Sequence, residues 1–298
     1  MRVAVTGASG LIGSALVPHL RSVGHEVQRL VRRPVAAPDE VWWDPTAGTV
    51  DLEPLQGIDA VIHLAGAGVG DHRWTDDYKR EILSSRVDST HTIVNAMLEL
   101  EQKPRVLVSA SAIGYYGDTG DRPVDETAPA GTGFLADVVR AWEAAASPAA
   151  SGGIRVVHPR TGLVVSGRGG AWARMFPLFK FGLGGKLGNG QQYWSWISLR
   201  DEVCALQFLM EQEHLSGPVN LTGPTPVTNA EVTSVMGHVM GRPTILPAPA
   251  FALKAVLGEF STEVLGSSRV LPAVLEQAQF RFQDPTIESA VRTALADS

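Results

Sequence analysis

The feature that most constrains this chain lies at its start, where a glycine-rich loop joins an apolar strand to a helix. We expect the strand over Arg2–Thr6 and the helix over residues 11–23. Three glycines follow this strand at intervals of three residues, Gly7, Gly10 and Gly13. They allow a tight turn, a close approach of the backbone to a diphosphate, and close packing of the helix. Free N–H groups at the start of the helix then favour an anion. The pattern predicts a dinucleotide site formed by Thr6, Gly7, Ser9, Gly10, Leu11, Ile12 and Gly13.

The end of the second expected strand, residues 26–31, decides between NAD and NADP. An acidic residue there would bind the ribose 2′-hydroxyl of NAD and repel a 2′-phosphate. This chain has Arg32 and Arg33 instead, and guanidinium groups bind phosphate through paired hydrogen bonds. The sequence favours NADP over NAD, with Arg32 better placed because it directly follows the apolar run. The alternative is that one or both arginines only solvate the strand end.

Apolar strands alternate with helices along much of the chain. Further strands are expected over residues 59–65, 105–109, 154–158 and 218–221, and further helices over 85–101 and 199–212. Nearly continuous apolar strands separated by helices are typical of a parallel sheet covered on both faces. The pattern predicts an α/β protein with a doubly wound parallel sheet, the Rossmann fold.

The regular alternation loosens in the second half, which suggests two domains. We expect an NADP-binding domain over residues 1–240, with substrate-side segments at about 165–200 and 222–240, and a smaller, mainly helical C-terminal domain over residues 241–298. The glycine-rich stretch 182–190 has two interpretations. It is either a flexible connector or a substrate-side floor where the backbone approaches a ligand.

Composition narrows the partners and the compartment. The formal net charge is −6 and no basic run is longer than Arg32–Arg33, which argues against nucleic acid because phosphate binding needs a basic surface. No run approaches the ~18 apolar residues of a membrane span, and no signal-peptide pattern is seen. The single cysteine, Cys204, excludes an internal disulfide and is interpreted as a small buried residue. We expect a cytoplasmic protein without a nucleic-acid or membrane partner.

Several ordered motifs together resemble a known superfamily. They are TGASGLIG, DAVIHLAG, VLVSASAIGYYG, HPRTGLVVSG and WSWISLRDEV, and they are similar to the extended short-chain dehydrogenases/reductases. The finer pattern, with SSRVDST, SGPVNLTGPTPVTNAE and the tail after residue 268, resembles the atypical bacterial epimerase family proteins. That group carries a short C-terminal domain of unknown function. The resemblance covers almost the whole chain.

The resemblance implies further contacts to the cofactor. Leu64, Ala65 and Gly66 would run along its adenosine and pyrophosphate side. Ser109 would end a strand beneath the nicotinamide ribose, and Pro159 would lie beside the nicotinamide.

Two polar residues have competing interpretations. Arg86, in SSRV, is expected to contact cofactor or substrate, with a surface salt bridge as an equal alternative. His63 lies inside an apolar strand, where a hydrogen-bonded core histidine is more common than a metal ligand. No metal site is expected.

The chain departs from the superfamily at its catalytic residues. The usual reaction needs a Ser or Thr that orients the substrate oxygen, a Tyr that exchanges a proton with it, and a Lys four residues later that lowers the pKa of the Tyr. Ser111 matches the serine, but Phe134 and Val138 stand where the Tyr and Lys are expected. Tyr115 or Tyr116, just after Ser111, is the candidate replacement acid. The alternative is that both tyrosines are walls of the pocket.

The sequence thus predicts an NADP-binding oxidoreductase or epimerase that acts on a small or sugar-like hydroxy or carbonyl substrate, with a homodimer as one allowed assembly. The alternative is a non-catalytic NADP sensor, which the missing Tyr and Lys favour. A structural protein without a cofactor is the third. Four aromatic residues are expected on the substrate side, with core packing as their alternative: Trp74, Tyr193, Trp194 and Trp196.

Overall fold

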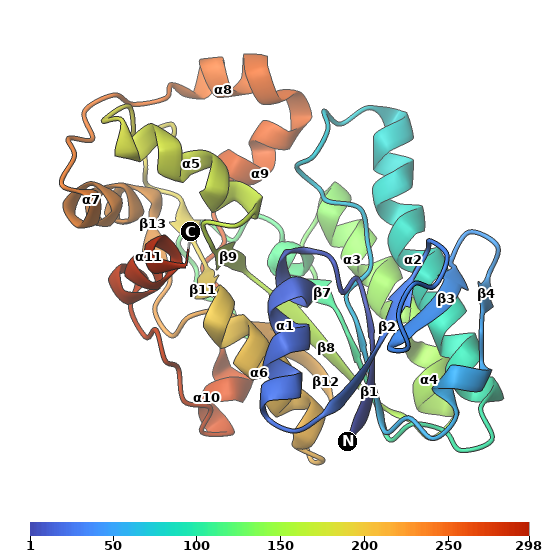
Figure 1. The fold of residues 1–298 in the computed structure, drawn as a ribbon. Helices are drawn as coiled ribbons and strands as arrows, with labels where there is room; N and C mark the ends of the chain where they lie inside the picture. Colours follow the sequence, from blue (N-terminus) through green and yellow to red (C-terminus); the bar gives the residue numbers. More distant parts are fainter. Residues whose placement is uncertain (298) are drawn as a thin grey trace.

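The computed structural model describes residues 1–297 and has a mainly parallel sheet at its centre (Figure 1). The strands of this sheet are β1 (Arg2–Thr6), β2 (Glu26–Val31), β3 (Glu40–Asp44), β4 (Thr49–Val50), β5 (Ala60–His63), β6 (Val106–Ser109), β7 (Ser111–Ala112), β8 (Arg155–Thr161) and β12 (Gly217–Leu221). Their order is β12-β8-β6-β5-β1-β2-β3-β4, with β7 paired to β8 and β4 antiparallel to β3.

Helices cover both faces of the sheet. They are α1 (Leu11–Ser22), α2 (Asp76–Glu99), α3 (Phe134–Ala145), α4 (Ser147–Ser151) and α6 (Leu199–Glu211). Successive side chains of a strand point to opposite faces, so Val3 and Val5 pack with α1 and α6 whereas Ala4 packs with α2 and α4. This two-sided core confirms the predicted doubly wound Rossmann fold.

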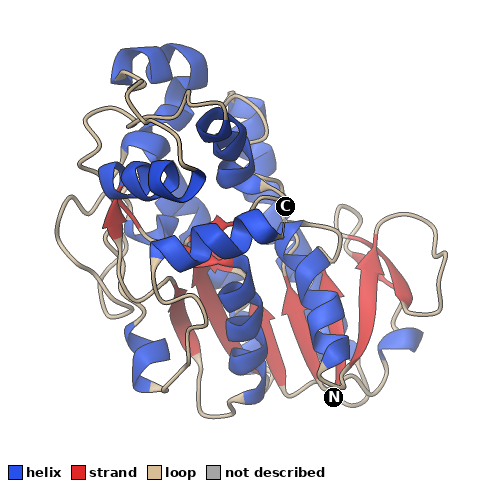
Figure 2. Cartoon of the chain, turned by 60° about the vertical axis from the view of Figure 1, so that its left-hand side comes forward, coloured by secondary structure: helices blue, strands red, loops and turns tan. Residues whose placement is uncertain are grey.

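A second, mainly helical region lies beyond one end of the sheet (Figure 2). Its elements are β9 (Leu163–Val165), α5 (Gly170–Lys180), β10 (Tyr193–Trp194), β11 (Trp196–Ser198), β13 (Val227–Thr228), α7 (Asn229–Met240), α8 (Ala250–Leu257), α9 (Ser261–Leu265), α10 (Ala273–Gln277) and α11 (Ile287–Ala296). Short 3₁₀ turns complete the described chain: η1 (Glu53–Leu55), η2 (Ile113–Tyr116) and η3 (Gly258–Phe260). None of the described helices combines the length and apolar character needed to cross a bilayer.

The C-terminal segment is tied closely to the rest of the molecule. The Asp201 carboxylate, at the start of α6, accepts hydrogen bonds from the backbone N–H groups of Gln283 at 2.8 Å and Asp284 at 3.0 Å. Val270 forms a bridge with Val124, and α11 packs on α7 and β11. The proposed boundary near residue 240 therefore separates two parts that share contacts, and it stays a prediction.

The predicted bounds of helices and strands agree best with the structure where the apolar pattern of the sequence is simple. The expected strands 2–6 and 26–31 match β1 and β2. Helix α2 begins at Asp76, earlier than the expected residue 85, because Thr75 caps it by accepting a hydrogen bond from Tyr78 N–H. Strand β3 was not predicted from the sequence. Its short apolar run is flanked by the charged residues Glu40 and Asp44. The segment before it contains two prolines, which is more typical of a loop than of the approach to a strand.

Candidate active site

The glycine loop after β1 has the shape that the sequence predicts. Gly7 has a φ of +65°, and a Cβ there would lie 2.7 Å from the Leu64 carbonyl carbon. A Cβ on Gly13 would lie 2.2 Å from the Gly7 carbonyl oxygen. Helix α1 starts at Leu11, and its N-cap residue Gly10 brings no side-chain cap among the described residues. The first N–H groups of α1 therefore stay available for an anion in a cradle of bare backbone.

Thr6 shapes the wall opposite this loop. Its fully buried hydroxyl oxygen accepts hydrogen bonds from the N–H groups of Leu64 at 3.0 Å and Ala65 at 3.2 Å, and it lies 2.7 Å from His63 Nδ1. The Thr90 hydroxyl donates to a backbone oxygen and lies 3.1 Å from His63 Nε2. His63 is therefore neutral with its proton on Nε2, and burial lowers its pKa to about 3. Both ring nitrogens are engaged, as in the core-histidine interpretation.

The two arginines after β2 have different surroundings. Arg33 pairs with the buried carboxylate of Glu40, where Nη1 lies 2.9 Å from Oε2. That bond, with a backbone bond from Ala36, lowers the pKa of Glu40 to about 2. Arg32 is exposed and has no ion pair within residues 1–297. Arg32 is thus the arginine left free for a ligand phosphate.

Ser111 lies at the start of a buried polar cluster at the carboxyl end of the sheet. Its hydroxyl donates to Glu143 Oε1 at 2.6 Å. Arg160 of β8 binds both oxygens of Glu143, with Nε at 2.8 Å and Nη2 at 2.9 Å. Burial raises the pKa of Glu143, but the bonds from Arg160 and Ser111 outweigh it and the net pKa is lowered. Glu143 is therefore an ionised acceptor for the Ser111 hydroxyl.

The two candidate tyrosines lie against the other side of Arg160. The Tyr116 hydroxyl accepts from Arg160 Nη1 at 2.9 Å and donates to Asn220 Oδ1 at 2.8 Å. Its side chain is buried, and burial raises its pKa. The expectation that Tyr116 donates a proton to substrate does not fit this enclosed position. The ring of the half-buried Tyr115 stacks against the Arg160 guanidinium, whose Cζ lies 3.4 Å from the ring centroid.

The positions of the missing Tyr and Lys belong to an apolar cluster. Phe134, at the start of α3, packs against Trp74 with ring centroids 5.0 Å apart. Val138, one turn later, is buried in the same cluster. Phe260 from the C-terminal segment lies 5.5 Å from the Trp74 ring. Trp74 therefore packs between the sheet domain and the C-terminal segment.

The remaining residues implied by the resemblance lie along the same edge of the sheet. Ser109 ends β6, and its fully buried hydroxyl has no hydrogen-bond partner among the described residues. Pro159 is buried in β8 opposite Val219 of β12. A Cβ on Gly66 would lie 3.2 Å from Arg86 Cγ. Gly66 follows β5 and Ser109 ends the neighbouring parallel strand β6, so both lie at the carboxyl edge where such sheets bind ligands.

Two features expected on the substrate side serve packing. Trp196 is fully buried and donates from Nε1 to the Thr225 carbonyl at 3.1 Å, and Trp194 packs on Trp172 of α5. In the 182–190 stretch, a Cβ on Gly185 would lie 1.9 Å from the Leu246 carbonyl oxygen. These glycines allow close contact between chain segments, and the stretch borders a cavity of about 80 Å³ beside α7.

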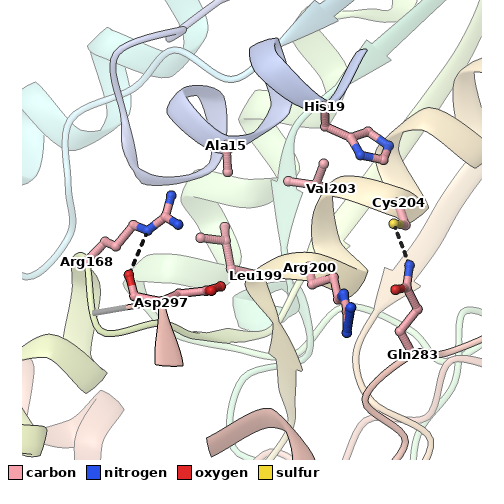
Figure 3. A pocket seen from close by; sticks show the side chains of 9 residues that line it. All are labelled: Ala15, His19, Arg168, Leu199, Arg200, Val203, Cys204, Gln283 and Asp297. Atoms are coloured by element: carbon pink, nitrogen blue, oxygen red, sulfur yellow. Dashed lines mark hydrogen bonds between the residues drawn. The ribbon is translucent and has the colours of Figure 1, made fainter. Parts of the chain in front are cut away.

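A larger cavity of about 350 Å³ lies between α1 and α6 (Figure 3). Cys204 lines it and accepts from Gln283 Nε2 at 3.1 Å. Burial raises the pKa of the Cys204 thiol, so it is protonated and unreactive at neutral pH. Cys204 is half-buried, not enclosed as expected from the sequence.

Comparisons with known proteins agree with this geometry. Residues 3–221 match the NAD dependent epimerase/dehydratase family, and residues 248–294 match a domain of unknown function, DUF1731. This chain belongs to the NAD dependent epimerase/dehydratase family. The epimerase family protein Mb2239 of Mycobacterium bovis is 49% identical over 290 residues, which are 97% of this chain and 96% of that protein. The chloroplastic SDR39U1 homolog of Arabidopsis thaliana is 38% identical over 99% of this chain and 87% of that protein.

Solved structures of relatives agree with the assignment. Human epimerase family protein SDR39U1 with NADPH has a TM-score of 0.91 and 30% identity, covering 100% of both chains. A nucleoside-diphosphate sugar epimerase from Corynebacterium glutamicum has a TM-score of 0.82 and 35% identity over 99% of this chain and 58% of that chain. The resemblance to atypical extended short-chain dehydrogenases/reductases is thereby confirmed.

Within this epimerase-family site, the sequence did not single out Glu143 and Arg160. Arg160 is the arginine of HPRTG, and Glu143 lies nine positions after Phe134 on the helix that lacks the Tyr and Lys. A usable signal was present, because an amphipathic helix that places a glutamate on its buried face needs a cation to pair with it.

Proposed function

We propose that this epimerase-family protein binds NADP(H) at the glycine loop and acts on a small or sugar-like hydroxy or carbonyl compound. The observation that carries the proposal is the uncapped start of α1 beside a loop whose glycines leave no room for side chains. The unpaired Arg32 at the end of β2 supports NADP over NAD, because a guanidinium matches a phosphate. The human relative solved with NADPH supports the same choice.

The residues of this chain suit the orientation of a substrate hydroxyl. When bound, the nicotinamide supplies or accepts the hydride. Because the Ser111 hydroxyl donates a hydrogen bond to Glu143 at 2.6 Å, the lone pairs of its oxygen are left to accept a hydrogen bond from a substrate hydroxyl. Arg160 holds Glu143 in place through its hydrogen bonds, and the half-buried Tyr115, whose ring stacks on Arg160, is the candidate acid beside Ser111.

The proposal is tested first by binding and then by turnover. We expect NADPH to bind the purified protein more tightly than NADH in calorimetry. A panel of carbonyl compounds, including nucleotide sugars, is then offered while the absorbance of the reduced nicotinamide is followed. Ser111→Ala should reduce the rate by about 100-fold or more if it orients the reacting oxygen, with NADPH affinity unchanged. Failure of wild-type protein to bind either dinucleotide would sink the proposal.

The second candidate is a non-catalytic NADP sensor, which the apolar packing of Phe134 and Val138 favours. An epimerase that restores its cofactor in each cycle escapes the absorbance test, so solvent deuterium exchange into candidate sugars is measured as well. NADPH binding without turnover or exchange, and with Ser111→Ala indistinguishable from wild type, would select the sensor.

A further inference from the structure

The end of the molecule opposite the N-terminus has a surface formed by residues 178–187 and 241–257 (Figure 1). The first segment holds the end of α5 and the loop after it, and the second leads into α8. Ala248 joins them, because its N–H donates to the Lys186 carbonyl at 2.8 Å and its carbonyl accepts from the Gly188 N–H at 2.9 Å. We call this surface the α5–α8 face.

Large apolar side chains are exposed on the α5–α8 face. Phe181, Ile245 and Phe251 are each 77% exposed and Val256 is 74% exposed, so these side chains project into the solvent. Three leucines of the face are about half exposed: Leu178, Leu183 and Leu246. Outside the face, no large apolar side chain of residues 1–297 is more than 51% exposed. Clustered apolar side chains of this kind mark a site of contact with a protein or a membrane, whereas single ones need no explanation.

Helix α8 has the same property along its whole length. All of its residues except Lys254 are apolar, yet none of them is buried. A helix that is apolar on all sides is normally enclosed by the rest of a protein or by a membrane. The described chain does not enclose α8, so its partner lies outside this chain.

The charge of the α5–α8 face differs from that of the whole chain. Residues 170–190 and 241–257 contain no Asp or Glu, although the chain as a whole has a net charge of −6. Glu259, which follows α8, already pairs with Lys79 at 2.7 Å. Four exposed cations of the face have no ion pair within residues 1–297: Lys180, Lys186, Arg242 and Lys254. The face is therefore a positively charged surface on an acidic protein, and it attracts an anionic partner.

We propose that the α5–α8 face docks on an anionic membrane surface. The projecting apolar side chains enter the boundary between head groups and acyl chains, while the basic side chains reach the anionic head groups. The long stems of Lys180 and Lys254 allow this, because such stems pack along apolar surface and keep the ammonium group in water. Docking of this kind needs no membrane-spanning helix, and the described helices include none. The expectation that the protein has no membrane partner concerned a spanning run and does not exclude it.

Two other occupants fit the face less well. A symmetric second copy would set the same patch against itself and oppose like charges. A partner protein would need a pocket for each projecting side chain, whereas a fluid interface adapts to them. The cavity of about 80 Å³ behind Leu178, Leu183 and Leu246 is too small to receive a peptide segment.

Vesicle sedimentation tests the docking. The probes are vesicles of phosphatidylcholine alone and vesicles of phosphatidylcholine mixed with phosphatidylglycerol. We expect the protein to sediment with the mixed vesicles and not with phosphatidylcholine alone. Salt at about 1 M, which shortens the screening length to about 3 Å, should release it.

Two double variants locate the contact. Phe181→Ser with Phe251→Ser removes two projecting rings, and Lys180→Glu with Lys254→Glu reverses two of the charges. Each should weaken binding to the mixed vesicles by about tenfold or more. All four side chains are exposed, so both variants should fold, and thermal unfolding checks that they do. The test does not depend on the proposed function, because none of these residues belongs to the glycine loop or to the Ser111 cluster.

The matched controls change side chains of the same kinds outside the face. Val23→Ser with Val35→Ser alters two exposed apolar residues. Lys103→Glu with Arg122→Glu reverses two exposed cations. Both control variants should bind the mixed vesicles as wild type does.

Four results would each overturn the proposal. The first is absence of binding to the mixed vesicles, and the second is equal binding to both kinds of vesicle. The third is binding that the face variants lower no more than the controls do. The fourth is a dimer in analytical ultracentrifugation that the serine variant of the face dissociates, which would show that a second copy covers the face.

Discussion

The glycine loop and the Ser111–Glu143–Arg160 cluster lie at the same edge of the sheet but are built in different ways. The loop is one continuous stretch, and its geometry follows from backbone limits at Gly7 and Gly13. The cluster joins side chains that are 32 and 17 positions apart in the chain and come from β7, α3 and β8. A backbone motif can be read from its spacing, whereas a side-chain cluster exists only after the elements have packed.

The largest effect should come from breaking the side-chain cluster. Arg160→Met leaves the Glu143 carboxylate buried without its cation, which destabilises a protein by about 3–5 kcal/mol. We expect that loss in urea unfolding of Arg160→Met. Glu143→Gln with Arg160→Met together should recover part of it, because no buried charge is then left alone. Equal stability of Arg160→Met and wild type would show that the cluster does not hold these elements together.

The next effect tests the loop. Gly13→Val places a side chain where a Cβ alone already meets the Gly7 carbonyl oxygen at 2.2 Å. The loop must move, and we expect NADPH affinity to fall by about 100-fold or more in calorimetry, as for a lost set of charge-assisted bonds. Gly48→Asn is the control, because no atom lies within 4 Å of the Cβ position of Gly48 and asparagine tolerates its φ of +70°. Retained affinity in Gly13→Val would contradict the cradle.

The same contrast explains which parts of the fold and of the site could be predicted from the sequence. Strands β1, β2 and β6, the Rossmann fold and the glycine loop follow from apolar runs and glycine spacing, which are local. The pairing of Ser111 with Glu143, and of Glu143 with Arg160, was not predicted. The helix pattern shows that Glu143 needs a cation, but which residues meet it is decided only when α3 and β8 pack. The surroundings of Tyr116 were hidden for a related reason, since sequence proximity to Ser111 did not reveal that its buried hydroxyl bonds Asn220 of β12. Its expected role as an acid stays a prediction.

A smaller effect should separate the two arginines that the sequence presents as a pair. Arg32→Ala removes the guanidinium without an internal partner, so NADP affinity should fall by about tenfold or more while NAD affinity stays the same. Arg33→Ala removes one of the two cations on Glu40, the other being Arg29, and should change NADP affinity much less. The ratio of NADP to NAD dissociation constants in the two variants is the measurement. A larger loss in Arg33→Ala would reverse the assignment made from the Glu40 pair.

The smallest effect is a pH dependence on the other face of the sheet, under α6. Glu202 of α6 is fully buried and accepts from the Thr161 hydroxyl at 2.8 Å, and burial raises its pKa from 4.5 to about 8. Between these pH values the folded protein binds the proton that the unfolded chain has lost. The stability contributed by Glu202 is therefore full below about pH 4.5 and is lost as pH rises through about 8.

Glu202→Gln keeps the shape and removes the titration. We expect the difference in melting temperature between this variant and wild type to shift in favour of the variant as pH rises across that range. Glu276→Gln, at an exposed glutamate, should show no such trend. A constant difference across the range would contradict a raised pKa of Glu202 in the folded protein.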